Sequence, residues 1–264
     1  MVDYHVHTNL CGHASGSMDE YCAAAARAGV IEIGFADHAP MPKHLRHGLS
    51  MMPEETEGYL RAAEELRERY ADAGRVIVRI GFEVDFPLFD SFDRRYLSDP
   101  RVDFLIGSSH FIDGWAFDHP DHADEWRDRN VDEVYSRYFS FIHDMAQSRL
   151  FDVVGHFDLV KKFGHRPKKD FTMAVTEIAG ILGAAGTAVE INTAGLTHRA
   201  EEQYPSERIL GILFDHNVPI TIGSDAHDPS GVGRFFSEAA DLAKRVGYRA
   251  VSGFSQRRRY DIPL

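Results

Sequence analysis

The feature that most constrains the fold of this 264-residue chain is an alternation of short apolar runs with longer helix-like segments. Seven runs are rich in β-branched residues and have the length of strands. They cover residues 2–5, 31–36, 76–83, 102–108, 152–155, 188–192 and 219–223. Repeated strand–helix–strand units predict parallel strands joined by right-handed crossovers. Seven such strands favour a distorted (β/α)7 barrel over an open sheet, so we predict an α/β protein of this class.

Helix boundaries are marked by capping signals between the runs. Ser17 with Glu20 predicts a capping box, and Asn130 with Glu133 predicts another helix start. The expected helices cover 17–29, 53–73, 130–148, 171–185, 205–216 and 236–246, and residues 247–264 are expected to form a tail. No Pro/Gly/Ser-rich linker, charge block or repeat divides the chain, and 44% of its residues are hydrophobic. We therefore predict a single domain over residues 1–264.

Residues that can bind metals end six of the seven runs. His5 and His7 are two apart in an expected strand, so both imidazoles point to the same face. The ends of parallel barrel strands meet at one face, where active sites are built. The candidates are His5, His7, His38, Glu83, His110, His156, Asp225 and His227, joined by His13 in the loop after the first run. Each alone could be a helix cap or a core histidine, but their clustering predicts a metal site.

These nine residues comprise seven imidazoles and two carboxylates, which are too many donors for one ion. Nitrogen-rich sets favour Zn, Mn or Fe over Ca or Mg. We predict two or three divalent transition-metal ions that share Glu83 as a bridge. Clustered divalent ions lower the pKa of a bridging water and neutralise phosphoryl oxygens, so the pattern favours displacement at phosphorus. Cys11, between His7 and His13, is either a further ligand or a small buried filler.

Charge and cysteine content limit the partners. A net charge of −12 argues against nucleic acid, whereas an anionic small molecule stays admissible because bound cations dominate their own cleft. Arginines 257–259 stand alone and are expected to be solvated. The longest uncharged apolar-rich run, residues 178–189, is too short to span a bilayer. The two cysteines form no disulfide framework and the chain starts directly with a strand, so we expect no membrane partner and a cytoplasmic location.

The motifs HVH, DH, SSH, GH and SDAH, with His13 and the strand-end Glu83, resemble the PHP (polymerase and histidinol phosphatase) superfamily. Longer segments resemble its histidinol-phosphatase branch: DYHVHTNLCGHASG, FADHAP, IGSSHFIDGWAFD, GHFDLVKKFG, EINTAGL and SDAHDPSGVGRFF. The resemblance covers essentially the whole chain and implies a distorted barrel with up to three metals. It assigns His5, His7, Glu83 and Asp225 to the first ion, Glu83, His110 and His156 to the second, and His13, His38 and His227 to the third.

The resemblance also implies an activity. The chain would be a phosphoric monoester hydrolase that converts L-histidinol phosphate to L-histidinol and phosphate in histidine biosynthesis, by in-line attack of a metal-bridging hydroxide. Asp225 or His227 would handle protons. Arg199 lies where this branch places a phosphate-binding basic residue. Lys161 and Lys162 depart from the arginine that relatives often carry there, which favours a point-charge contact or a surface position over a bidentate contact.

Other functions fit parts of the pattern. A PHP-type phosphoesterase could act on another small phosphomonoester or on DNA ends, although the acidic balance argues against DNA. A non-catalytic metal-binding scaffold is expected to have lost ligands, and none is missing. An amidohydrolase also begins with His-x-His, but it does not predict His13, His38 and His227 as a third set.

Three loop features have open roles. His44 and His47 lie in the loop 40–53, which could act as a lid over the metals. Trp115 and the acids between residues 118 and 124 either contact the substrate or belong to a solvated loop.

Overall fold

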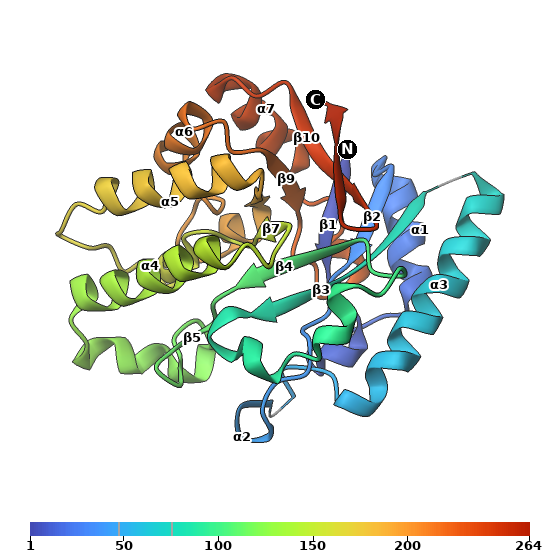
Figure 1. The fold of residues 1–264 in the computed structure, drawn as a ribbon, viewed down its shortest axis with the longest axis horizontal. Coiled ribbons are helices and arrows are strands. Elements are labelled where there is room, and N and C mark those ends of the chain that lie inside the picture. Colours follow the sequence, from blue (N-terminus) through green and yellow to red (C-terminus); the bar gives the residue numbers. More distant parts are fainter. Residues whose placement is uncertain (47, 75) are drawn as a thin grey trace.

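The computed structural model describes residues 1–46, 48–74 and 76–264. Within these residues, seven parallel strands form one sheet, and helices surround it (Figure 1). In sheet order the strands are β1 (Val2–Val6), β2 (Glu32–Phe35), β3 (Ile77–Asp85), β4 (Phe104–Ser108), β7 (Val153–Val154), β8 (Ala188–Asn192) and β9 (Ile220–Gly223). A short ribbon follows β4, formed by β5 (Phe111–Ile112) and β6 (Trp115–Ala116).

The sheet curves into a nearly closed barrel. The segment that follows β9 lies beside the end of β1. There Val6 and Ala226 form a parallel bridge, and His7 N donates to Ala226 O at 2.9 Å. The predicted distorted (β/α)7 barrel is therefore confirmed. All seven predicted strands are present, and 188–192 matches the bounds of β8. Of the predicted run 152–155, only the two residues of β7 form a strand. The backbone leaves the extended conformation soon afterwards, at His156, which has a φ of 20°.

Helices cover the outside of the barrel between successive strands (Figure 1). They are α1 (Met18–Ala28), α3 (Thr56–Ala73), α4 (Val131–Ser148), α5 (Thr172–Ala185), α6 (Glu207–Asp215) and α7 (Phe236–Val246). The short helix α2 (Lys43–Arg46) instead projects from the loop that follows β2 (Figure 1). The predicted capping box is present: Ser17 Oγ accepts from Glu20 N, and the Glu20 carboxylate accepts from Ser17 N at 2.7 Å. Asn130 likewise caps α4 by accepting from Asp132 N at 3.0 Å. None of the described helices is long and apolar enough to cross a membrane.

Aromatic side chains fill the barrel near the N-terminal ends of its strands. The Phe104 ring packs edge-on against Tyr4, with 5.0 Å between the ring centroids. Two neighbouring strands have glycines where this ring lies. A Cβ on Gly34 would come within 2.8 Å of the Phe104 ring, and one on Gly81 within 2.6 Å. These glycines therefore make room for the aromatic core.

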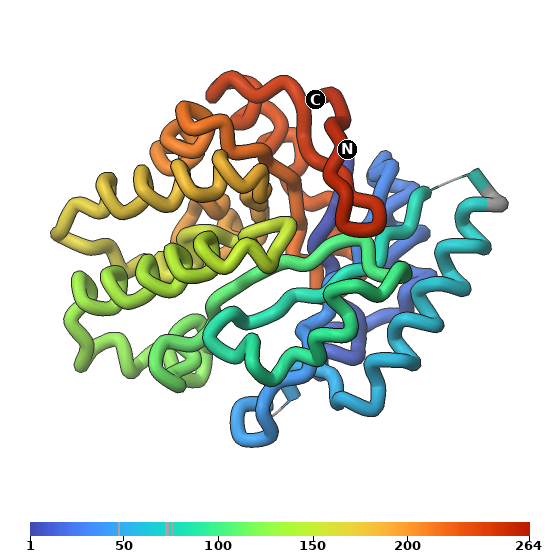
Figure 2. The backbone as a smooth tube through the Cα atoms, viewed as in Figure 1, coloured from blue at the N-terminus to red at the C-terminus, as the bar shows by residue number. Residues whose placement is uncertain are grey.

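The predicted C-terminal tail is wrong, because these residues form an antiparallel hairpin. Strands β10 (Ala250–Ser255) and β11 (Arg258–Pro263) pair along their whole length. The hairpin lies beside the start of the chain (Figure 2), where Phe254 N donates to the Tyr4 hydroxyl oxygen at 2.8 Å. Val251 and Phe254 are buried, so the hairpin covers apolar surface at the N-terminal end of the barrel.

Polar contacts fasten the hairpin to the barrel strands. The carboxylate of Glu32, which is only 4% exposed, accepts from the Tyr260 hydroxyl at 2.6 Å and from Arg79 Nε at 3.0 Å. Backbone Gln256 N donates to Asp103 Oδ1 at 3.0 Å. Arg79 Nη2 also donates to the Tyr260 hydroxyl oxygen at 2.7 Å, so the hairpin is joined to β2, to β3 and to the start of β4.

The arginines at the hairpin turn do not form one solvated cluster. Arg257 pairs with Asp152, its Nη2 donates to Leu150 O at 2.8 Å, and its side chain is 22% exposed. Arg258 is exposed, and Arg259 pairs with Asp261 on the same strand. The expectation of solvation was therefore wrong for Arg257, because a carboxylate next to β7 lies within its reach.

The Phe254→Ala variant tests the hairpin as a stabilising element. Phe254 is 1% exposed and packs against Tyr4 and Phe104. Its truncation should lower the free energy of unfolding by about 3–5 kcal/mol, because it removes buried area and leaves a cavity. Urea denaturation measures this, with exposed Arg258→Ala as the matched control. Equal midpoints for the two variants would contradict a stabilising role.

Candidate metal centre

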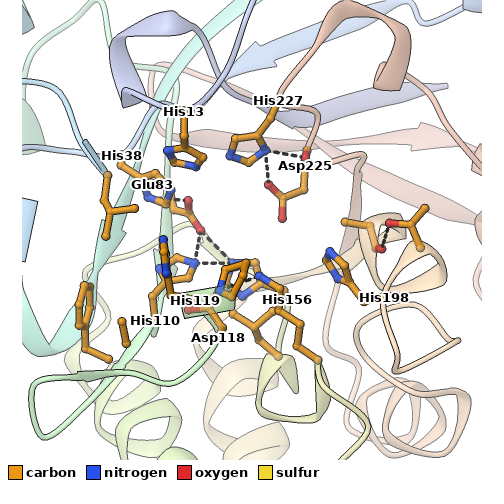
Figure 3. A pocket seen from close by; sticks show the side chains of 18 of the residues that line it. His13, His38, Glu83, His110, Asp118, His119, His156, His198, Asp225 and His227 are labelled. Atoms are coloured by element: carbon orange, nitrogen blue, oxygen red, sulfur yellow. Dashed lines mark hydrogen bonds and ion pairs between the residues drawn. The ribbon is translucent and has the colours of Figure 1, made fainter. Parts of the chain in front are cut away.

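The nine predicted ligands lie together at the C-terminal ends of the barrel strands, and Figure 3 shows seven of them around a cavity. His5 belongs to β1 and Glu83 to β3, and His7 follows β1 directly. The others come from loops: His13 after the helical turn Asn9–Cys11, His38 after β2, His110 after β4, His156 after β7, and Asp225 and His227 after β9. The barrel topology thus brings together residues that are more than 200 positions apart in the sequence.

Glu83 is at the centre of the cluster. Its carboxylate is 1% exposed. Imidazole nitrogens within 4 Å of it belong to His5, His7, His38, His110 and His156. The shortest contacts join Oε1 to His156 Nε2 at 2.9 Å and Oε2 to His38 Nδ1 at 3.0 Å. Burial alone would raise the pKa of Glu83, but nearby imidazoles, led by His38 and His5, hold that pKa well below its usual value.

The two oxygens of Glu83 face different groups of donors. Oε1 contacts His156 and lies 3.6 Å from His110 Nε2, and the two imidazoles are 3.2 Å apart at their Nε2 atoms. Oε2 lies 3.4 Å from His5 Nε2 and 3.6 Å from His7 Nε2. Glu83 would therefore contribute to both donor groups if ions were bound there.

Asp225 completes the group that contains His5 and His7. Its Oδ1 lies 3.4 Å from His7 Nε2 and 3.9 Å from His5 Nε2. Burial would raise the pKa of Asp225, but the neighbouring histidines, with His5 the strongest, hold it well below its usual value. The backbone of Asp225 has a φ of 53°, a left-handed conformation that non-glycine residues rarely adopt.

The third predicted set is more open. The rings of His13 and His227 stack with 4.5 Å between their centroids, and those of His13 and His38 with 5.7 Å. Cys11 Sγ also lies within 4.8 Å of ligand atoms of His13 and His227. Cys11 is fully buried, and burial raises the pKa of its thiol to about 12. Its buried position suits either of the two interpretations, ligand or filler.

The donor set fits divalent transition metals. His5 Nε2 and His227 Nε2 are buried, and neither has a hydrogen-bond partner among the described residues. Buried ring nitrogens without partners are costly unless a metal or water satisfies them. Seven imidazoles and two carboxylates within one cluster therefore form a candidate site for such ions.

Comparison with known proteins agrees with this geometry. A family model described as PHP domain matches residues 3–194. The chain belongs to the PHP domain family. It is 35% identical over 254 residues to the probable histidinol-phosphatase of Deinococcus radiodurans, and the alignment covers 96% of both chains. It is 27% identical over 263 residues to the histidinol-phosphatase of Bacillus subtilis, covering 88% of this chain and 95% of the relative.

A solved structure shares the fold of this PHP protein. The crystal structure of histidinol phosphate phosphatase from Lactococcus lactis, in complex with zinc, L-histidinol and phosphate, superposes with a TM-score of 0.79. The two chains are 21% identical, and the superposition covers 98% of each.

The sequence interpretation missed a carboxylate that supports the PHP metal centre. Glu190 Oε1 lies 2.7 Å from His5 Nδ1, and Oε2 accepts from His156 N at 2.8 Å. Asn192 Nδ2 donates to the same Oε2 at 3.1 Å. Glu190 thereby holds His5 with Nε2 toward the cluster and also fixes the backbone of His156. A glutamate inside an apolar strand run was the signal that could have revealed it.

Asp85 has the same role for His110. Its Oδ2 lies 3.1 Å from His110 Nδ1, and its Oδ1 accepts from His110 N at 2.8 Å. Burial alone would lower the pKa of His110, but the charges of Asp85 and Glu83 outweigh it and raise that pKa to about 10.

The cavity beside the cluster has a volume of about 540 Å³. Its wall also contains groups that are not predicted ligands. The polar ones are Asp118, His119, Lys162, Thr197, His198, Asp228 and Arg234, and the apolar ones include Met41, Leu49, Phe111, Ala116 and Leu159. Among these, the sequence interpretation missed His119, Thr197, His198, Asp228 and Arg234, because none of them follows a strand directly.

The predicted phosphate-binding residues lie in different places. Arg199 is exposed and is not among the residues that line the cavity. Lys161 is buried, and its Nζ lies 2.8 Å from Asp158 Oδ2 and donates to Gln203 O at 3.0 Å. Lys162 lines the cavity and pairs with Asp118 at 3.0 Å.

Only some of the predicted loop residues line the cavity. Asp118 lines the cavity, whereas Asp121 and Asp124 are exposed, so the acidic loop has one member at the site. Trp115 is buried. His44 lines a neighbouring depression rather than the cavity, and His47 lies outside the described residues. A lid function for this loop stays a prediction.

The Glu83→Gln variant tests the bridging role. Because Glu83 faces two donor groups, loss of its charge should remove two ions per chain and lower activity at least about 100-fold. Elemental analysis of the purified variant measures the metal content. Exposed Glu177→Gln is the matched control, and unchanged metal content in Glu83→Gln would contradict the bridge.

The Glu190→Gln variant tests the support of the ligands. Glutamine keeps the size of the side chain but removes the charge that orients His5, so metal affinity should fall about 10–100-fold. Competition with a chelator measures the affinity. An affinity equal to that of Glu177→Gln would show that Glu190 has no role in positioning the ligands.

Proposed function

We propose that this PHP protein is a metal-dependent phosphatase that hydrolyses L-histidinol phosphate to L-histidinol and inorganic phosphate, a step of histidine biosynthesis. The observation that carries the proposal is an intact set of nine donors in a chain that is similar over 96% of its length to a probable histidinol-phosphatase. A non-catalytic scaffold does not require a complete donor set beside a cavity.

Two or three ions would be held by the three donor sets around Glu83, with zinc, manganese or iron as the candidates. Zinc is supported by its presence in the Lactococcus lactis histidinol phosphate phosphatase. When bound, such ions lower the pKa of water and neutralise phosphoryl oxygens. Asp225 and His227 both line the cavity, and we assign proton transfer to one of these two side chains.

Cationic side chains of the protein would bind the phosphate from outside the metal cluster. Lys162 lines the cavity, and its contact with Asp118 holds the ammonium group in place. Its compact charge makes a point contact with a phosphoryl oxygen. We keep Arg199 as a proposed contact at the rim, because it directly follows the cavity residue His198.

We further propose that residues 1–264 act as one domain, because the C-terminal hairpin packs against Tyr4 at the start of the chain. Cys11 and Cys22 are free and buried, which supports a reducing, cytoplasmic location. The expected substrate is a small phosphomonoester, and we expect neither nucleic acid nor a membrane as a partner.

Phosphate release from a panel of monoesters tests the function and its metal dependence. The zinc- or manganese-loaded enzyme should have a higher kcat/KM for L-histidinol phosphate than for every other ester, because the donor cluster and the relatives point to this substrate. Chelation should abolish the activity, and added metal should restore it.

Different outcomes separate the alternatives. Preference for another monoester or for DNA ends would overturn the substrate and leave the metal site. A protein without metal and without activity after metal addition would overturn both.

A further inference from the structure

His198 lies on the cavity wall across from His38 and Glu83 (Figure 3). It follows the helical turn Thr193–Thr197, which begins at the end of β8. It is none of the nine predicted ligands, so its presence in the cavity needs another explanation.

Tyr204 holds His198 from behind. The Tyr204 hydroxyl oxygen lies 3.1 Å from His198 Nδ1, and Tyr204 is fully buried. Backbone hydrogen bonds join Tyr204 and Asn192 in both directions, at 2.7 and 3.0 Å. Asn192 Nδ2 also donates to Asp225 Oδ2 at 3.2 Å. The His198–Tyr204 pair is therefore mounted on the same strand end that supports the metal cluster.

The direction of this hydrogen bond sets the tautomer of His198. Burial raises the pKa of Tyr204, so its hydroxyl stays protonated and needs an acceptor. Among the described residues, its one hydrogen-bond partner is His198 Nδ1. When Nδ1 accepts, the ring proton of a neutral imidazole lies on Nε2. Burial and the charge of Lys162 lower the pKa of His198 to about 4, so the ring is neutral near pH 7.

Other donors line the cavity with His198. Lys162 and Arg234 are both cavity residues, and both charges act on His198. Arg234 Nε is buried, and no described residue accepts a hydrogen bond from it. His198 Nε2 likewise has no hydrogen-bond partner among the described residues. Lys162 already pairs with the Asp118 carboxylate. Arg234 Nε and the protonated His198 Nε2 can only donate, so a group with anionic oxygens suits both of them.

We propose that His198 donates from Nε2 to a phosphoryl oxygen of the substrate, and that Tyr204 is the positioning residue that keeps the proton on that nitrogen. This inference rests on the proposed phosphatase function for its substrate. It assigns the two walls of the cavity different tasks. The cluster around Glu83 holds the ions, and the wall with His198 contacts phosphate oxygens that face away from them.

Binding of inorganic phosphate to the zinc-loaded protein tests the contact. His198→Ala should weaken phosphate binding about 10- to 100-fold, because a hydrogen bond to a charged group is lost. His198→Gln should recover part of the loss, since its amide N–H can replace Nε2. His143→Ala on the outside of α4 is the control and should bind phosphate normally. Zinc content should be the same in all variants, and unchanged phosphate binding by His198→Ala would overturn the proposal.

Nitrogen NMR of the histidine rings tests the tautomer independently of activity. In the zinc-loaded protein, the His198 signals, assigned by their absence from His198→Gln, should show a protonated Nε2 that shifts on phosphate addition. Tyr204→Phe should populate both tautomers and weaken phosphate binding without changing zinc content. A protonated Nδ1 in the unmodified protein, or an unaltered tautomer in Tyr204→Phe, would overturn the role of Tyr204.

Because the probe is inorganic phosphate, the experiment tests the His198 contact separately from the proposed histidinol-phosphatase function. If the enzyme prefers another ester but His198→Ala still weakens phosphate binding, the proposed substrate fails and the His198 contact stands. If L-histidinol phosphate is hydrolysed and all variants bind phosphate equally, only the His198 contact fails.

Discussion

The arrangement of the site depends on how the negative charge of one buried carboxylate, that of Glu83, is compensated. Glu83 is 1% exposed, and an ionised carboxylate in that position is very costly unless positive charge is close to it. Five histidines surround it, and in their protonated form they supply positive charge that holds its pKa low. Divalent ions would compensate both Glu83 and Asp225 and would also satisfy ring nitrogens that have no partner. The C-terminal end of the barrel is therefore built for cations, and its polarity follows from that requirement.

Stability and chemistry lie at opposite ends of the barrel. At the N-terminal end, Phe104, Tyr4 and Phe254 pack together and Glu32 joins the hairpin to the strands. At the other end, Glu190 holds the ligands from below. This separation lets the site tolerate unsatisfied polar atoms and strained backbone, because the apolar end supplies the stabilising burial.

The sequence predicted the barrel and the cluster through a single regularity, ligand residues at the ends of apolar runs. That regularity is visible because strands are short and their ends share one face. Glu190 was not visible in this way, because it lies within a run whose neighbours are buried and apolar. The hairpin was missed because arginines 257–259 suggested solvation, whereas Asp152 pairs with Arg257 only in three dimensions.

The two adjacent lysines also show what the sequence alone could not predict. Lys161 and Lys162 are equivalent by composition, and only the turn of the chain after Asp158 decides which enters the cavity. Arg234 and His198 reach the cavity from loops whose course no periodicity describes. Candidate residues next to strand ends could thus be located from the sequence, and cavity residues that depend on the course of a loop could not.

The two walls of the cavity explain how an acidic chain can accept an anionic substrate. A net charge of −12 describes the whole chain, whereas a ligand in the cavity would meet any bound ions on one side and Lys162, Arg234 and His198 on the other. Under the proposed function, a phosphate group between these walls would have its oxygens engaged from both directions. Its ester substituent must then point toward the remaining lining, which includes the apolar side chains of Met41, Leu49 and Phe111. Under the proposed function, discrimination between monoesters would therefore fall to these loop residues rather than to the donor cluster around Glu83.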